Sequence, residues 1–387
     1  MHTQKLFYED CSLRQFTACV TGCQKTDKGY AVTLDRTAFY PEGGGQACDT
    51  GILGSARVLD VRESDGQIIH LCDSPLSPGE TAEGRIDYDR RFDLMQQHSG
   101  EHIVSGIVHK RFGFHNVGFH MGADVMEVDF DGFIPPEAIA QIELEANKAV
   151  WANLPVRCWY PSPEELPHVT YRTKRILPWP VRIVDIPDID TCACCGIHVA
   201  ATGQIGIIKI LSCVKFRGGV RLEISCGARA TTYLNRIFEE NRQVSQAFSA
   251  KPLETGAAAH RMNELLAAEK FRCAGLQKQL FEKLAADYTG KGDVLVFYPG
   301  LTSAEIRELA EKIASSCNGT AAVLCEGKGR LDVCLVNLHG DVKELGSAMS
   351  QALGGRGGGK HGFFQGSLTT DRKAAEDFFA RFGFDIS

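Results

Sequence analysis

Short apolar runs alternate with turn residues over the first ninety residues of the chain. The apolar residues there lack the three- or four-residue spacing of an amphipathic helix, so strands are expected. The runs cover residues 16–20, 30–34, 56–61 and 68–71. This pattern predicts a small β-barrel or β-sandwich over residues 1–90.

The pattern changes to mixed helices and strands from Arg91 to about residue 230. Apolar residues at helical spacing predict one helix from Arg91 to Gly113. Two prolines predict a second helix from Pro135 to about Asn153. Strands are expected in a hairpin over 116–130 and at 181–186, 205–210 and 220–225. Helices mixed with antiparallel strands are typical of the α+β class.

Two further parts are predicted in the C-terminal half. Residues 231–290 read as a helical linker whose near-heptad leucines fit either a helical hairpin, a coiled coil, or a helix packed on a neighbouring domain. Residues 291–387 alternate strands and helices, as in a small α/β domain. We therefore predict an α+β protein in four parts, divided at 1–90, 91–230, 231–290 and 291–387.

Composition restricts the classes of protein to consider. With 44% hydrophobic and 23% charged residues over 387 positions, the chain is globular and long enough for more than one core. No apolar run reaches the eighteen residues of a membrane span, and MHTQKLFYED does not resemble a secretory signal. We expect a cytoplasmic protein with no membrane partner, whose fifteen cysteines are reduced. The net charge of −6 argues against indiscriminate nucleic-acid binding but allows a local basic face.

Two pairs of metal-ligand residues share a four-residue spacing. His98 and His102 lie on the first predicted helix, where this spacing places both rings on one face. Cys194 and His198 repeat the spacing in ACCGIHV. Three imidazoles and one thiolate suit tetrahedral Zn²⁺, so we predict one zinc ion per chain.

The pattern leaves the fourth ligand and the role of the metal open. Cys192 and Cys195 compete with Cys194, which we prefer because it reproduces the four-residue spacing. Four protein ligands are typical of a structural site, whereas catalysis usually keeps an open position. In HSGEH, Glu101 directly precedes His102 and does not complete HExxH, so a metallopeptidase is poorly supported.

Two glycine-rich segments could contact phosphate. Gly43–Gly45, in TAFYPEGGGQ, fits a phosphate cradle or a tight turn, and it lacks the GK[ST] ending of a P-loop. In GGRGGGKHG (354–362), flexible backbone beside Arg356 and Lys360 fits an RNA contact or a solvated loop.

These motifs together resemble the free-standing relatives of the alanyl-tRNA synthetase editing domain, in the long form that keeps the synthetase's C-terminal domain. The matching segments are residues 37–51, 96–108, 181–210, 217–227 and 354–362. The resemblance implies trans-editing, which is hydrolysis of the ester that joins serine, or glycine, to tRNA(Ala). It also implies that the zinc ligands of this editing domain are His98, His102, Cys194 and His198.

The resemblance implies further roles and departs from the family at one motif. The family's CGGTH reads CCGIH here, so Cys195 replaces a glycine and Ile197 a threonine. A threonine at the position of Thr37 lies beside the family's amino-acid pocket, where its hydroxyl could recognise serine. Gln46 is the next pocket candidate.

The last part of the chain resembles the family's tRNA-binding and dimerising domain. We therefore expect Arg356 and Lys360 to contact tRNA, and a homodimer is a further expected partner. No Ser-His-Asp arrangement is visible, so we assign no catalytic residue and expect water to attack the ester directly.

Two other functions compete with this one. The chain could be a tRNA-binding or synthetase-associated module whose zinc is purely structural. It could also be a phosphoesterase, because the last part is related to the substrate domain of DHH phosphoesterases. The second is weakened because the metal motif of that catalytic domain is not found in the sequence.

Overall fold

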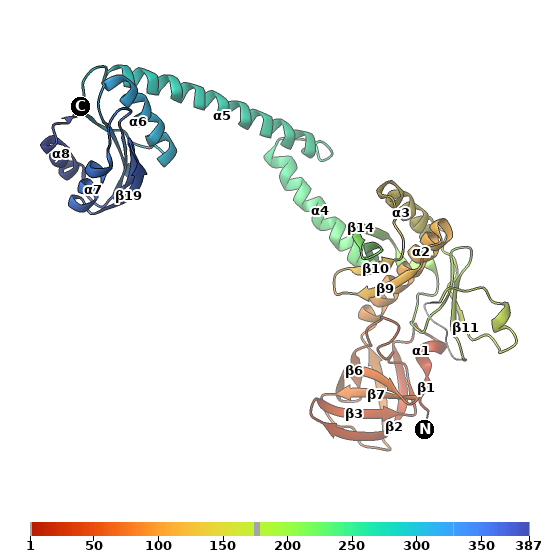
Figure 1. Ribbon diagram of the computed structural model, residues 1–387. Helices are drawn as coiled ribbons and strands as arrows, with labels where there is room; N and C mark the ends of the chain where they lie inside the picture. The colour runs from red at the N-terminus through yellow and green to blue at the C-terminus, as the bar shows by residue number, and fades with distance from the viewer. Residues whose placement is uncertain (1, 174–178, 328, 387) are drawn as a thin grey trace. The chain divides into compact units, whose positions relative to one another are not determined.

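The computed structural model describes residues 2–173, 179–327 and 329–386 (Figure 1). The chain divides into two compact units, Met1–Val244 and Ser245–Ser387. Helices and sheets occur in both units, which confirms the mixed α+β class. The finer division into four parts stays a prediction.

The N-terminal unit begins with six strands in the order β2-β3-β7-β6-β5-β8, which close into a barrel. Buried side chains alternate with partly buried ones along β7 and with exposed ones along β8, as strands with one face on a core require. The six strands are β2 (Gln15–Thr26), β3 (Gly29–Leu34), β5 (Gly51–Leu53), β6 (Ala56–Ser64), β7 (Gln67–Cys72) and β8 (Thr81–Ile86). The short elements β1 (Gln4–Lys5), α1 (Leu6–Glu9) and β4 (Arg36–Thr37) lie before and between them.

Helix α2 (Tyr88–Phe112) is the central element of this unit. The Asp87 carboxylate accepts a hydrogen bond from the backbone N–H of Arg90, and Gly113 ends the helix with φ of 74°. Every residue from 94 to 108 is buried, so the helix has no solvent face there. The helix was predicted to start at Arg91, three residues too late. The prediction followed the spacing of apolar residues, and this spacing does not extend into the first turn, which Asp87 caps.

Two sheets and a second helix surround α2. The first sheet has the order β14-β15-β10-β9 and the second the order β11-β12-β13. Their strands are β9 (Asn116–Met121), β10 (Met126–Phe130), β11 (Arg157–Trp159), β12 (Ile183–Ile186), β13 (Asp190–Ala193), β14 (Ile208–Phe216) and β15 (Gly219–Cys226). Helix α3 (Pro136–Trp151) starts at the predicted prolines, and the predicted strand over 205–210 begins only at Ile208, after a 3₁₀ turn (Thr202–Ile205). One continuous hydrophobic core joins these elements to the barrel.

The helices of the linker are present as predicted. They are α4 (Gly227–Ala247) and α5 (Thr255–Ala286). Near the end of α5, Phe281 and Ala285 are buried in the core of the C-terminal unit. Among the described residues, no helix is long and apolar enough to cross a membrane.

The C-terminal unit is a six-stranded sheet in the order β19-β20-β18-β17-β16-β21 with helices on both faces. Helix α6 and the end of α5 pack on one face, and α7 and α8 pack on the other. The elements are β16 (Val294–Phe297), α6 (Ser303–Cys317), β17 (Ala321–Gly327), β18 (Arg330–Val336), α7 (Lys343–Ala352), β19 (Gly355–Lys360), β20 (Phe363–Leu368), α8 (Arg372–Arg381) and β21 (Asp385–Ile386).

One expectation in this unit is wrong. The segment GGRGGGKHG is not a flexible loop, because residues Gly355–Lys360 form the edge strand β19, paired antiparallel with β20.

Candidate metal centre

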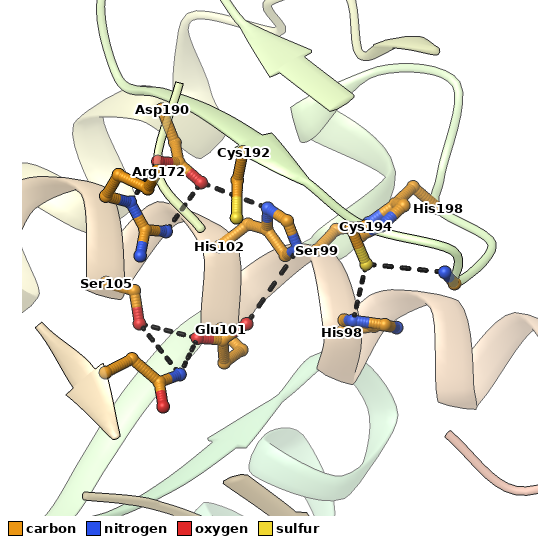
Figure 2. A network of polar contacts seen from close by, with 12 residues as sticks. His98, Ser99, Glu101, His102, Ser105, Arg172, Asp190, Cys192, Cys194 and His198 are labelled. Carbon is orange, nitrogen blue, oxygen red and sulfur yellow. Dashed lines mark hydrogen bonds and ion pairs between the residues drawn. The ribbon is translucent and has the colours of Figure 1, made fainter. Parts of the chain in front are cut away.

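The two predicted ligand pairs meet inside the N-terminal unit (Figure 2). His98 and His102 project from one face of α2, and Cys194 and His198 lie in the loop that follows β13. Their potential ligand atoms all lie within 4.8 Å of one another. Cys194 Sγ is 3.4 Å from His98 Nε2. The structure therefore brings together all four residues selected from the sequence.

Each histidine of this cluster is held through Nδ1 by an oxygen atom. The three pairs are His98 with Gln46 Oε1 at 2.9 Å, His102 with Asp190 Oδ2 at 3.0 Å, and His198 with Ser99 Oγ at 3.2 Å. The amide and carboxylate oxygens can only accept, so the first two rings donate from Nδ1. This arrangement leaves Nε2 as the ligand atom, as is usual for histidines that bind metals.

An unsatisfied ring nitrogen supports the fit of a metal ion. His198 Nε2 is buried and has no hydrogen-bond partner among the described residues. A buried polar atom without a partner costs free energy unless something else binds it. Three imidazoles and one thiolate are the donor set that zinc prefers, so these residues fit a zinc ion.

The electrostatics of the cluster favour the ligating forms of Cys194 and His198. Burial raises the pKa of the Cys194 thiol, but the charge of His98 and a hydrogen bond from His102 outweigh burial and hold this pKa well below its usual value. The thiolate is the form that binds metals. Burial, followed by the charge of His98, lowers the pKa of His198 to about 3, so this ring stays neutral.

Asp190 orients His102 and is itself held by Arg172. The Arg172 guanidinium donates to Asp190 Oδ1 from Nε at 2.6 Å and to Oδ2 from Nη2 at 2.8 Å. Burial raises the pKa of Asp190, but hydrogen bonds from His102 and Arg172 bring it below its usual value. Both carboxylate oxygens are engaged, so this residue supports the ligand His102.

The two competing cysteines differ from Cys194. Cys192 also lies near His102 and Asp190, but burial raises its pKa to about 11, which favours the thiol. Cys195 is exposed and lies outside both groups of potential ligands. The pKa directions favour Cys194 over Cys192 as the ligand, and the position of Cys195 outside the cluster disfavours it.

The loop that carries Cys194 is held by its backbone. Arg182 Nη1 donates to the carbonyl oxygens of Cys194 and Gly196 at 3.0 and 2.7 Å. A Cβ atom at Gly196 would lie 2.1 Å from His98 Cε1, so this position has no room for a side chain. The glycine between the two ligands is therefore required by the close approach of the loop to α2.

The glycine segment 43–45 forms a tight turn that delivers Gln46 to the cluster. The backbone groups of Gly43 and Gln46 pair at 2.9 and 3.1 Å, and Gly44 and Gly45 have φ of 60° and 82°. A Cβ atom at Gly45 would lie 2.6 Å from the Phe119 ring. The glycines are therefore explained by the turn and its crowding, without a phosphate.

Thr37 does not lie in the cluster. Its side chain is fully buried in the barrel, where its hydroxyl lies 2.9 Å from His70 Nε2 and accepts a hydrogen bond from the Phe39 N–H at 3.1 Å. Of the two pocket candidates, the structure brings Gln46 to the cluster and gives Thr37 protein partners elsewhere. A contact of Thr37 with substrate stays a prediction. Arg356 and Lys360 are exposed in the other unit, on β19.

Several polar residues around the cluster were not anticipated from the sequence. Asp190, Arg172 and Ser99 support histidines, and Glu101 is buried beside His102. For Ser99 and Glu101, the sequence offered one signal, which is the run of polar residues on α2. It becomes informative only once that part of the helix is known to be buried throughout.

Comparisons with known proteins match two parts of the chain to family models of tRNA synthetases. Residues 3–90 match the family model of class II (A) tRNA synthetases, and residues 181–222 match that of the threonyl and alanyl tRNA synthetase second additional domain. An alanine–tRNA ligase of Pyrobaculum aerophilum is 33% identical over 97% of this chain, which spans only 44% of that enzyme.

Two shorter relatives match over nearly their whole length. The alanyl-tRNA editing protein AlaX-L of Pyrococcus horikoshii is 28% identical, with 94% of each chain covered. The alanyl-tRNA editing protein Aarsd1 of Mus musculus is also 28% identical, over 96% of this chain and 95% of that protein. The chain is thus similar to part of an alanine–tRNA ligase. It is a homologue of the alanyl-tRNA editing proteins over most of its length.

Proposed function

We propose that this chain is a trans-editing hydrolase that releases serine, or glycine, from mischarged tRNA(Ala). The observation that carries the proposal is the match over nearly the whole chain with two proteins named alanyl-tRNA editing proteins. The cluster of three histidines and one cysteine lies within the part of the chain that is common to them and to the ligase.

We further propose that His98, His102, Cys194 and His198 hold one zinc ion. When bound, zinc would supply a Lewis acid that stabilises developing negative charge or orients the substrate amino group. The chain itself keeps the rings in place through Gln46, Asp190 and Ser99 and excludes bulk water by burial of α2.

Direct attack by water is the proposed chemistry, because the nearest serine is not placed as a nucleophile. Ser99 is fully buried, its oxygen accepts from the Val199 N–H at 3.2 Å, and it lies 3.2 Å from His198 Nδ1. An aminoacyl ester is already reactive, so a positioned water and electrostatic stabilisation are sufficient.

The decisive experiment is a deacylation assay on tRNA(Ala) charged with serine, glycine or alanine. The purified full chain should release serine or glycine much faster than alanine. Binding of all three tRNAs without release of any amino acid would instead favour the tRNA-binding module with a structural zinc.

Elemental analysis tests the ligand set. We expect about one zinc per chain in the wild type and a sharp loss in His102→Ala and Cys194→Ala, because each removes a ligand atom. The matched control is Cys195→Ala, which removes the adjacent exposed thiol and should keep the metal. Full zinc in both ligand variants would show that the assignment is wrong.

The C-terminal unit is proposed to bind tRNA through Arg356 and Lys360 and to support a homodimer. Both side chains are exposed and stand four residues apart on one strand, which places them on the same face. Light scattering on the full chain tests the homodimer.

A further inference from the structure

Glu101 is a buried carboxylate beside the metal cluster with one oxygen held and one left over. Its side chain is buried, with the whole residue 5% exposed, and its Oε2 lies 3.9 Å from His102 Nε2 (Figure 2). Its Oε1 accepts two short hydrogen bonds, from Ser105 Oγ and Asn116 Nδ2, both at 2.5 Å. No described residue donates a hydrogen bond to Oε2, so this atom remains an available acceptor on the side of the cluster.

The second carboxylate at the cluster is arranged differently. Both oxygens of Asp190 accept hydrogen bonds from Arg172, and one also accepts from His102 Nδ1. Asp190 therefore contacts Nδ1 of His102, whereas Glu101 lies near Nε2 of the same ring, the atom proposed to bind the metal. Of the two acids, only Glu101 has an oxygen to which no described residue donates a hydrogen bond, and this oxygen can act on a substrate or a water.

We propose that Glu101 is the general base of the deacylation reaction. The inference rests on the proposed function and supplies the catalytic residue that the sequence left unassigned. Ser105 and Asn116 fix the carboxylate through Oε1, so that Oε2 can orient the attacking water and accept its proton.

The reaction balances with these groups. The water oxygen forms a bond to the ester carbonyl carbon while Oε2 takes one proton from the water. The bond between that carbon and the ribose oxygen then breaks, and Glu101 returns the proton to the ribose oxygen. The products are tRNA with a free terminal hydroxyl and the amino acid, whose new carboxyl group releases a proton to solvent.

The position of Glu101 also accounts for hydrolysis at a site with four protein ligands. Because Glu101 is not one of the four ligands, it can orient the attacking water even when these ligands fill the coordination positions of the metal. In HSGEH, Glu101 lies three residues after His98, close to one turn of α2, so its side chain reaches the cluster without the HExxH spacing.

The test compares Glu101→Gln with the wild-type chain on Ser-tRNA(Ala). Glutamine keeps the size and the acceptor for Ser105 and Asn116 but cannot take up a proton. We expect kcat to fall by about 10²- to 10⁴-fold, with KM nearly unchanged. Zinc content and zinc affinity, measured by chelator competition without substrate, should stay close to those of the wild type.

Two further variants distinguish chemistry from structure. Glu101→Ala should regain part of its kcat in sodium formate but not in sodium chloride of equal concentration, because only formate supplies a carboxylate. Ser105→Ala, which keeps the base but removes one of its two donors, should lose less than about 10-fold.

Two outcomes would overturn the assignment. One is a Glu101→Gln enzyme whose kcat is within threefold of the wild type. The other is a loss of activity that follows a loss of zinc, which would make Glu101 a support of the metal. A wild-type chain that releases no amino acid from any charged tRNA(Ala) would instead refute the proposed function, and the role of Glu101 with it.

Discussion

His70 lies inside the barrel with both ring nitrogens engaged. Its Nδ1 is 3.1 Å from the Val32 carbonyl oxygen, which can only accept, so Nδ1 carries the proton and Nε2 accepts from the Thr37 hydroxyl. Burial lowers the pKa of His70 to about 4, compared with about 6.5 in an unfolded chain. Between these values the unfolded chain binds a proton that the folded chain does not, so the free energy of unfolding falls as the pH falls.

The contribution of His70 should be visible in the pH dependence of stability. Urea unfolding of the wild type should lose up to about 3 kcal/mol more between pH 6.5 and pH 4 than unfolding of His70→Gln. Other titrating groups are common to both proteins, so they cancel in the comparison. Parallel stability curves over this range would contradict the buried, neutral state of His70.

Thr37 supports this network from the other side. Thr37→Val keeps the shape of the side chain but removes the partner of His70 Nε2 and of the Phe39 N–H. We expect unfolding to become easier by about 1–3 kcal/mol. The control Thr21→Val removes an exposed hydroxyl and should change stability by less than about 0.5 kcal/mol. For Thr37→Val, a lower ratio of serine release to alanine release than in the wild type would support the predicted role of Thr37 in the amino-acid pocket. An unchanged ratio would leave selectivity to Gln46.

At the residue scale, the sequence predicted what depends on local spacing. His98 and His102, or Cys194 and His198, are visible as pairs because four residues separate them. Asp190 supports His102 across 88 residues, and no local pattern reports such a contact. The availability of Glu101 Oε2 likewise depends on which partners reach its other oxygen.

At the element scale, a buried ion pair fixes helix α2 to the barrel region. The Arg91 guanidinium is fully buried, contacts the Asp49 carboxylate, and donates to the Leu13 carbonyl oxygen at 3.2 Å. Asp49→Ala should therefore lower the free energy of unfolding by about 3–5 kcal/mol, because it leaves Arg91 charged and buried. The control Glu311→Ala removes a carboxylate from an exposed pair with Arg307 and should cost about 1 kcal/mol or less, as judged by urea unfolding. Equal costs for the two variants would count against this linkage.

Strand β19 shows why glycine content misled the prediction of an element. Three of its residues are consecutive glycines, which in the sequence indicate a flexible loop. A Cβ atom at Gly357 would lie 2.6 Å from the Gln365 carbonyl oxygen of β20. The glycine allows close pairing of the two strands, and a single sequence cannot distinguish this use of glycine from flexibility.

The same strand carries the proposed contacts to tRNA. A double variant, Arg356→Ala with Lys360→Ala, should weaken tRNA binding and lower the slope of log affinity against log salt by about 1–2. The charge-matched control is Lys373→Ala with Arg381→Ala on α8, which should leave the slope nearly unchanged. Equal effects of the two double variants would indicate a response to net charge and not a contact at β19.

At the scale of the whole molecule, the two units have separate hydrophobic cores. One core runs from Phe7 to Cys226. Of the two cores on either face of the C-terminal sheet, one starts at Phe281 and the other at Leu295. A cut near Gly290, as the linker boundary in the sequence would suggest, would separate Phe281 and Ala285 from the core that buries them. The sequence predicted the helices of the linker, but not which core the end of α5 joins.

A truncated chain that ends at Ala250 keeps α4 whole and lacks the C-terminal unit, because the cut falls between the end of α4 and the start of α5. This truncated chain retains every residue of the cluster, so we expect zinc content and hydrolysis at saturating Ser-tRNA(Ala) to remain close to those of the full chain. Its affinity for tRNA should be weaker, and the salt dependence of binding should be flatter, because the phosphate contacts of the C-terminal unit are lost. Binding across a salt series, with the wild type and the Arg356/Lys360 double variant measured in parallel, checks both expectations. If the truncated chain bound tRNA as tightly as the full chain at every salt concentration, RNA affinity would have to come from the N-terminal unit alone.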